Sequence, residues 1–145
     1  MARRPDHQTR DLFAVPAPAA MLPGSLEFGL AVRRLVADAI KNSPLTIYQI
    51  AARMTELIGV EITVHQLHAW TAPSREGWRF PLEYLPALEA AAETHDITAW
   101  LAGVRGGQLH IGRDVLHAEL GRLERLRDEA ARKIKSLKNS MGDCE

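Results

Sequence analysis

Hydrophobic residues along this chain recur at the spacing of an α-helix. Starting at Val32, they occupy positions i, i+3, i+4, i+7 and i+8, ending at Ile40. This spacing collects them on one face of a helix. Ser25 is a residue type that caps helix N-termini, and Asn42-Ser43-Pro44 is typical of a helix end. The pattern predicts a helix over residues 26–41 that buries one stripe.

Two further helices begin with the same signal, a threonine followed three residues later by a glutamine. Thr46 and Gln49 form the first pair, and Thr63 and Gln66 form the second. In such a capping box each side chain bonds to the backbone N–H of the other residue. Gly59, between the two helices, is a natural helix stop. We expect the buried sides to consist of Ile47, Ile50, Ala51, Met54 and Leu57 in the first helix, and of Val64, Leu67 and Trp70 in the second.

The next segment alternates between loop and helix. Residues 71–80 have loop composition, and we expect Trp78 within them to plug the core. Residues 81–94 predict a fourth helical region, with Pro86 in its first turn or at a kink. Asp96 is expected to cap a fifth helix that stops before Gly106. No segment alternates as a strand does, so the sequence predicts an all-α fold.

The last helix is predicted to begin near Asp114, and its apolar positions repeat every seven residues. Their spacing alternates between four and three, which is the a/d seam of a coiled coil. Arg127 and Ala130 weaken the middle of this seam. We expect the helix to pair two chains, although a single amphipathic helix lying on its own domain is the alternative. The residues expected to carry dimerisation are Leu116, Leu120, Leu123, Ile134 and Leu137.

These elements divide the chain into three parts. Residues 1–24 are rich in proline and are expected to form a flexible arm, with a short apolar island from Leu12 to Val15. Residues 25–107 are expected to form the helical domain, and residues 112–140 the C-terminal amphipathic helix. Hydrophobic residues make up 46% of the 145, enough to bury a core.

Charge is unevenly distributed, although the net charge of the whole chain is zero. Residues 25–106 carry seven basic and nine acidic residues, a net charge of −2. Residues 122–138 carry seven basic and three acidic residues, a net charge of +4. Affinity for nucleic acid comes largely from neutralising phosphates. A DNA-binding face in the helical domain must therefore arise from local clustering of its arginines.

Residues 46–54 and 63–70 together have the pattern of a helix-turn-helix. Ala51 is small enough to let a second helix cross closely. With Leu67 and Trp70 buried, the second helix would expose short, uncharged side chains suited to base edges. Gln66 could pair with adenine through two hydrogen bonds. The residues expected to contact bases are His65, Gln66, His68, Ala69 and Thr71, and those expected to hold phosphates are Arg53, Arg75 and Arg79. Solvated surface positions are the alternative for Arg75 and Arg79.

On these residues and the order of five helices, the chain resembles the lambda-repressor/Cro-like helix-turn-helix superfamily over residues 26–106. The resemblance implies a five-helix domain that reads DNA with the helix beginning at Val64. In one respect the chain departs from the family pattern. Thr55-Glu56-Leu57-Ile58 prolong the first helix by about one turn before Gly59.

A second resemblance covers more of the chain, to short proteins encoded in Mu-like transposable prophages. It implies a phage or mobile-element context and a regulatory or accessory role. It is carried by Asp11-Leu12-Phe13, Val15-Pro16, Pro44-Leu45, residues 48–54, Ala69-Trp70-Thr71-Ala72, residues 74–81 and Trp100-Leu101-Ala102.

The sequence contains no pattern typical of an enzyme or a cofactor site. There is no nucleophile elbow and no phosphate-binding glycine loop. His65 and His68 have a spacing that can hold a metal, but no further ligands are placed to complete a zinc site. We therefore expect no catalysis, no metal and no cofactor.

We also expect a cytoplasmic protein that does not enter a membrane. No apolar run approaches the roughly 20 residues that span a bilayer. Residues 1–6 lack an apolar stretch of the signal-peptide type, and the single Cys144 can form no intrachain disulfide.

The sequence thus predicts a dimer that binds double-stranded DNA and regulates a phage or mobile element. The alternative is a phage-encoded adaptor or inhibitor whose helical bundle binds a host protein, which the acidic helical domain favours. A third possibility is a structural dimer within a larger nucleoprotein complex.

Overall fold

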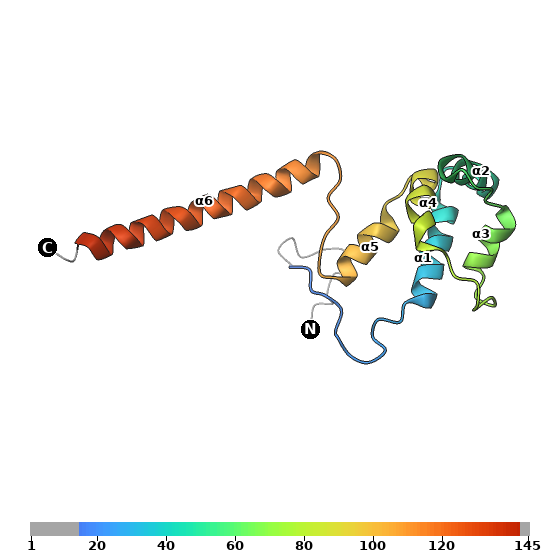
Figure 1. The fold of residues 1–145 in the computed structure, drawn as a ribbon, viewed down its shortest axis with the longest axis horizontal. Coiled ribbons are helices and arrows are strands. Elements are labelled where there is room, and N and C mark those ends of the chain that lie inside the picture. The colour runs from blue at the N-terminus through green and yellow to red at the C-terminus, as the bar shows by residue number, and fades with distance from the viewer. Residues whose placement is uncertain (1–14, 143–145) are drawn as a thin grey trace, which may run out of the picture. The chain divides into compact units, whose positions relative to one another are not determined.

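The computed structural model describes residues 15–142, in which the regular elements are helices and no strand is formed, and this confirms the all-α class. Residues 1–14 and 143–145 lie outside the described residues, and they include residues 12–14 of the expected apolar island. The chain forms two compact units, residues 1–108 and 109–145. The elements are α1 (Gly29–Asn42), α2 (Ile47–Ile58), α3 (Val64–Thr71), a 3₁₀ turn (Leu82–Tyr84), α4 (Leu85–Ala92), α5 (Asp96–Val104) and α6 (Arg113–Gly142) (Figure 1).

The first helix begins three residues later than predicted, and the expected cap at Ser25 is wrong. The Ser25 hydroxyl donates to the carbonyl of Ala20 and accepts from the N–H of Leu22, so it closes a turn instead. Phe28 occupies the N-cap position of α1 without a side-chain cap. The Glu27 carboxylate accepts a hydrogen bond of 3.0 Å from the Gly29 N–H. Glu27 therefore takes part of the capping role at this terminus.

Both predicted capping boxes are confirmed. The Thr46 N–H donates to Gln49 Oε1 at 2.9 Å, and the Gln49 N–H donates back to the Thr46 hydroxyl at 3.3 Å. Thr63 and Gln66 repeat this exchange at 2.8 and 3.2 Å. Gly59 ends α2 with a φ of 77°, a left-handed conformation that glycine adopts without steric cost. The pair α2 and α3 is thus fixed at three of its ends by local hydrogen bonds.

Helix α5 begins differently from the prediction, because its cap comes from α4 rather than from Asp96. Glu89 is only 6% exposed, and its carboxylate accepts from the Thr98 N–H at 2.8 Å. It also accepts from the Thr98 hydroxyl at 2.6 Å. A carboxylate at this position satisfies an N–H that the helix cannot and complements the positive end of its dipole. Pro86 lies in the first turn of α4, as predicted.

Helix α1 is the centre of the first unit and contacts α2, α3, α4 and α5, while α2 also packs against α3 and α4. The most buried side chains are Ile50, Met54, Leu67, Leu88 and Val36. The predicted burial of Leu57 is wrong, since its side chain is 46% exposed. Leu57 lies in the last turn of α2, where it lines an open groove beside Val60 and Pro86.

The described end of the N-terminal arm contacts the end of α5. The Ala19 N–H donates to the Val104 carbonyl at 2.9 Å, and Pro18 forms an isolated antiparallel bridge with Arg105. A Cβ at Gly106 would lie 2.8 Å from Pro18 Cδ, so this approach requires glycine. Val15, by contrast, is 86% exposed.

Helix α6 makes up most of the second unit, and its start agrees with the one predicted near Asp114. None of its described residues is buried. The apolar seam residues Leu116, Leu120, Leu123, Ile134 and Leu137 are between 49% and 70% exposed. In the part of the chain that the structure describes, no helix is both long and apolar enough to cross a membrane.

Candidate nucleic-acid interface

Helix α3 presents a narrow exposed edge rather than the broad one predicted. His65 and His68 are exposed, and Gln66 and Thr71 are half-buried. The predicted exposure of Ala69 is wrong, because its side chain is only 2% exposed. Both α1 and α2 pack against α3, which has only eight residues, so the buried arc takes in Ala69 as well as Leu67 and Trp70. Ala69 is therefore not available for a base contact.

Two of the predicted base-reading side chains use their polar atoms within the helix. Gln66 Oε1 accepts from both the N–H and the hydroxyl of Thr63, at 2.8 and 3.2 Å. The Thr71 hydroxyl donates to the Leu67 carbonyl at 3.0 Å. A two-bond contact between Gln66 and adenine needs the amide oxygen as well as the amide nitrogen. Such a contact would thus open the capping box that starts α3.

The loop after α3 contains two aromatic residues, and one of them, Trp78, is exposed although the sequence predicts its burial. Phe80 packs edge-on against Trp70, with ring centroids 5.4 Å apart and an interplanar angle of 88°. Trp78 was expected in the core, but its side chain is 48% exposed. The Arg75 guanidinium lies 5.9 Å from the Trp78 ring centroid. Tyr84 also packs against Trp70, with ring centroids 5.9 Å apart, and Trp78 remains at the surface beside Arg75.

Four of these exposed side chains form one continuous surface patch. Arg75 Nη1 lies 3.5 Å from His65 Nε2, which brings the loop arginine next to the exposed edge of α3. His68 follows His65 by three positions on that edge, and Trp78 lies under the Arg75 guanidinium. We call His65, His68, Arg75 and Trp78 the α3 surface. It combines groups that donate or accept hydrogen bonds with one fixed positive charge.

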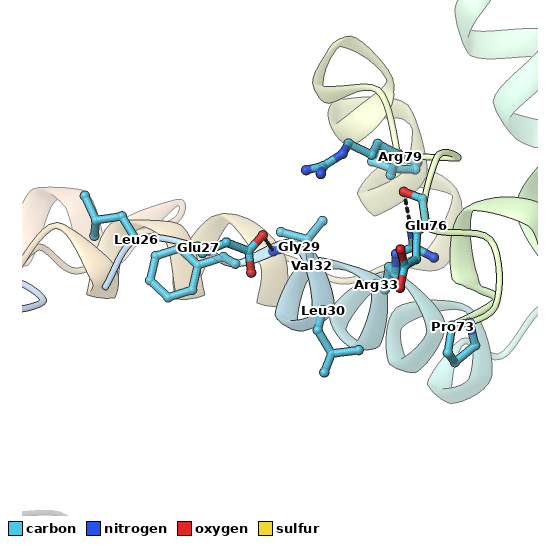
Figure 2. Close-up of a pocket in the computed structure, with 11 residues that line it drawn as sticks. Leu26, Glu27, Gly29, Leu30, Val32, Arg33, Pro73, Glu76 and Arg79 are labelled. Atoms are coloured by element: carbon cyan, nitrogen blue, oxygen red, sulfur yellow. Dashed lines mark hydrogen bonds between the residues drawn. The ribbon is translucent and has the colours of Figure 1, made fainter. Parts of the chain in front are cut away.

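Arg33, on α1, positions the loop that carries Arg75, and sequence reasoning missed it. Its guanidinium donates to the carbonyls of Arg75 and Glu76 at 2.7 and 2.8 Å, and also to the Ala72 carbonyl. Figure 2 shows the contact with Glu76. The planar guanidinium can reach several acceptors at once. The partners lie 39 to 43 residues further along the chain, so no local sequence pattern predicts the contact.

The three predicted phosphate-binding arginines do not gather at one place. Arg53 forms an exposed ion pair with Glu56, one turn along α2. Arg79 lies near the N-terminus of α1, where a Cβ built on Gly29 would be 3.8 Å from its Nη1. There it lines a pocket of about 690 Å³ together with Glu27 and Glu76 (Figure 2). Of the three, only Arg75 belongs to the α3 surface.

A further exposed aromatic residue on this unit was not singled out from the sequence. Tyr48 lies in the first turn of α2 and its side chain is 72% exposed. Its position on the helix opposite the buried Ile50 and Met54 is the signal that could have identified it as exposed. Within residues 15–142, no three His, Cys, Asp or Glu side chains are grouped as a metal site would require.

Two pairs of exposed charged side chains on α6 are hydrogen-bonded to each other. Glu119 accepts hydrogen bonds of 2.8 and 2.6 Å from Arg122, which lower the pKa of Glu119 and raise that of Arg122. Arg127 donates to its neighbour Asp128 at 2.9 Å, which raises the pKa of Arg127. These pairs are fully exposed, so they order side chains along the helix and contribute little to stability. The apolar seam of α6 stays uncovered by them.

Comparison with known proteins adds no relative to this description: no protein-family model, no curated protein and no solved structure matches the chain.

Proposed function

We propose that this protein binds double-stranded DNA as a dimer, with α3 of each chain in the major groove. A lambda-repressor-like arrangement of α1 to α5 is part of the proposal, and it is supported by the order of the helices and by the two capped helices of the helix-turn-helix. The resemblance of residues 48–54 and 69–72 to prophage proteins supports a regulatory role in a phage or mobile element.

The observation that carries the proposal is the α3 surface. His65 and His68 are exposed on one edge of a short helix, and Arg75 lies 3.5 Å from His65. Imidazole nitrogens can donate to or accept from base edges, depending on tautomer. A guanidinium beside them can hold a phosphate and fix the register of the helix in the groove. We assign base reading to the two histidines and phosphate binding to Arg75.

We assign the DNA-contacting roles to a different set of residues from the one expected from the sequence alone. Gln66 is assigned to the start of α3 and Ala69 to the interior, and neither belongs to the proposed base-reading set. Tyr48 enters the proposal instead, because the first helix of a helix-turn-helix crosses the DNA backbone. Its exposed phenol, in the first turn of α2, can donate a hydrogen bond to a phosphate oxygen.

The charge of the domain limits how strongly one chain can bind. Residues 25–106 carry a net charge of −2, and among them Arg33 and Arg53 already have carbonyl or carboxylate partners. If Arg75 of each chain neutralises one phosphate, a dimer makes about two such contacts, and log K should fall with log salt with a slope of about −1.8. Two linked chains are therefore needed for useful affinity.

A fluorescence-polarisation titration of the full chain tests the proposal, using phage-derived and random duplexes at two salt concentrations. We expect His65→Ala and His68→Ala each to weaken the preferred site by about 5- to 150-fold, corresponding to 1–3 kcal/mol, and to leave random duplexes unaffected. Arg75→Ala should weaken all sequences alike. His110→Ala, an exposed histidine outside the α3 surface, is the matched control.

Two outcomes would contradict the proposal. One is the absence of binding to any duplex at low salt. The other is a double His65→Ala, His68→Ala variant that retains the parent's preference. The first outcome would favour the second candidate, an adaptor or inhibitor that binds another protein. The observation favouring that candidate is the acidic net charge of the helical domain, which repels DNA.

A further inference from the structure

The apolar side chains of the α6 seam are all exposed in the described chain. Eight positions from Leu116 to Met141 follow each other at alternating spacings of four and three. This spacing places Leu120 and Ile134 at a positions and Leu116, Leu123 and Leu137 at d positions. We infer that α6 pairs with α6 of a second copy of this chain in antiparallel orientation, with Leu116 of one copy opposite Met141 of the other. The inference specifies the dimer of the proposed function and does not depend on DNA binding.

The first argument is that the seam can pair along its whole length with a second copy that runs in the opposite direction. In an antiparallel pair, a positions face d positions of the other helix. Aligning Leu116 with Met141 brings all eight seam positions into a–d layers at once, and a shift by one heptad in either direction leaves terminal apolar residues unpaired. The layers, each occurring twice by symmetry, are Leu116–Met141, Leu120–Leu137, Leu123–Ile134 and Arg127–Ala130.

The second argument comes from the centre of the seam. A parallel, in-register pair would stack Arg127 on Arg127 and Ala130 on Ala130. The Arg127 layer would bring two like charges together at a desolvated position. The Ala130 layer would leave a cavity between the two helices. The antiparallel pair places the long Arg127 opposite the small Ala130 in both central layers. Each arginine stem then covers an alanine while its guanidinium stays in solvent.

The third argument comes from the charges that flank the seam. Glu119 and Lys133 occupy g positions, and Glu124 and Lys138 occupy e positions. In a parallel pair, g contacts the following e of the other chain, which would place Glu119 beside Glu124 and Lys133 beside Lys138. All of these contacts are between like charges. Antiparallel pairing instead lays the end with the two glutamates alongside the end with the two lysines.

The orientation has a geometric consequence for the rest of the chain. Helix α6 has 30 residues, so its length is about 45 Å at 1.5 Å per residue. In an antiparallel pair the two N-terminal ends of α6 lie at opposite ends of this rod, whereas a parallel pair would bring them together. The two copies of the preceding unit are thus attached about 45 Å apart along the rod.

Disulfide trapping of the full-length chain tests the orientation, in a Cys144→Ser background. Leu116→Cys and Met141→Cys are prepared separately, and each is oxidised alone and in an equimolar mixture. We expect the mixture to yield a covalent dimer on a non-reducing gel, and each variant alone to remain uncrosslinked. Sedimentation of the unmodified chain should show a dimer. Leu120→Glu should abolish it, and Ala118→Glu, on the outward side of the same turn, should not.

Each alternative result overturns the inference. Crosslinking of the single variants by themselves would show a parallel pair. A dimer in sedimentation without crosslinks in the mixture would show a different register or surface. A monomer at all concentrations, or a dimer that survives Leu120→Glu, would show that α6 does not pair. DNA binding is measured independently, so a monomer that still binds its site would overturn the pairing and leave the DNA proposal standing.

Discussion

Replacing Arg33 is the sharpest test of how the α3 surface is held. Arg33→Met keeps most of the side-chain length and apolar stem but removes the donors to the carbonyls of Ala72, Arg75 and Glu76. Hydrogen bonds from a charged donor contribute about 1.5–3 kcal/mol each when buried. Only the bond to Ala72 is part-buried, while the other two are exposed and screened by solvent. We therefore expect a loss of about 2 kcal/mol in the free energy of unfolding.

Urea unfolding followed by circular dichroism measures this loss, with Arg34→Met as the control. Arg34 is the exposed neighbour of Arg33 on α1 and has the same charge, so its replacement should change stability by less than about 0.5 kcal/mol. If the chain binds DNA as proposed, Arg33→Met should also weaken this binding, as expected for Arg75→Ala, since a loosened loop no longer positions Arg75. Equal stability of the two variants, together with unchanged amide exchange in residues 72–79, would show that Arg33 does not hold the loop after α3.

Three further predictions concern individual side-chain contacts. Glu89→Ala leaves the N–H and hydroxyl of Thr98 without their acceptor and should lower the free energy of unfolding in urea by about 2–3 kcal/mol. Glu89→Gln keeps an oxygen there and should lower it by about 1 kcal/mol. Equal losses in the two variants would contradict this role of Glu89. Gln66→Ala and Gln49→Ala each open one capping box and should each lower stability by about 1 kcal/mol in the same assay. Because Arg122 lowers the pKa of Glu119, the charged carboxylate stabilises α6 above its ordinary pKa. This contribution is lost as the pH falls below about 4, so far-ultraviolet circular dichroism should show a larger loss of helicity in the parent than in Glu119→Gln.

The parts of the fold that the sequence predicts correctly depend on residues close together in the chain. Each capping box is complete within four residues, and the stop at Gly59 requires only a left-handed conformation at one position. The seam of α6 likewise repeats at short spacing. Such features are set by backbone geometry, so they appear in the sequence before any tertiary contact is known. The all-α class follows from them.

Burial at the candidate site depends instead on which distant segments pack together. Ala69 is covered because α1 and α2 both contact α3, and Trp78 is exposed because Phe80 already fills the place beside Trp70. In a helix of eight residues, the spacing of apolar residues does not show whether one neighbouring helix or two will pack against it. The role of Arg33 is equally hidden, since its acceptors are main-chain carbonyls, and every residue type has one.

Gln66 shows how a residue's role in folding restricts its role in recognition. The same amide oxygen that would complete a two-bond contact with adenine accepts two hydrogen bonds from Thr63. Using it on DNA would require opening the first turn of α3, the helix proposed to enter the groove, at a cost of about 1 kcal/mol. Gln49 provides the comparison, because it makes the same box in α2. If Gln66→Ala changes DNA sequence preference and Gln49→Ala does not, Gln66 reads bases despite its cap. If both lower stability and neither changes preference, reading falls to His65 and His68, whose ring nitrogens need not leave a helix cap to meet a base.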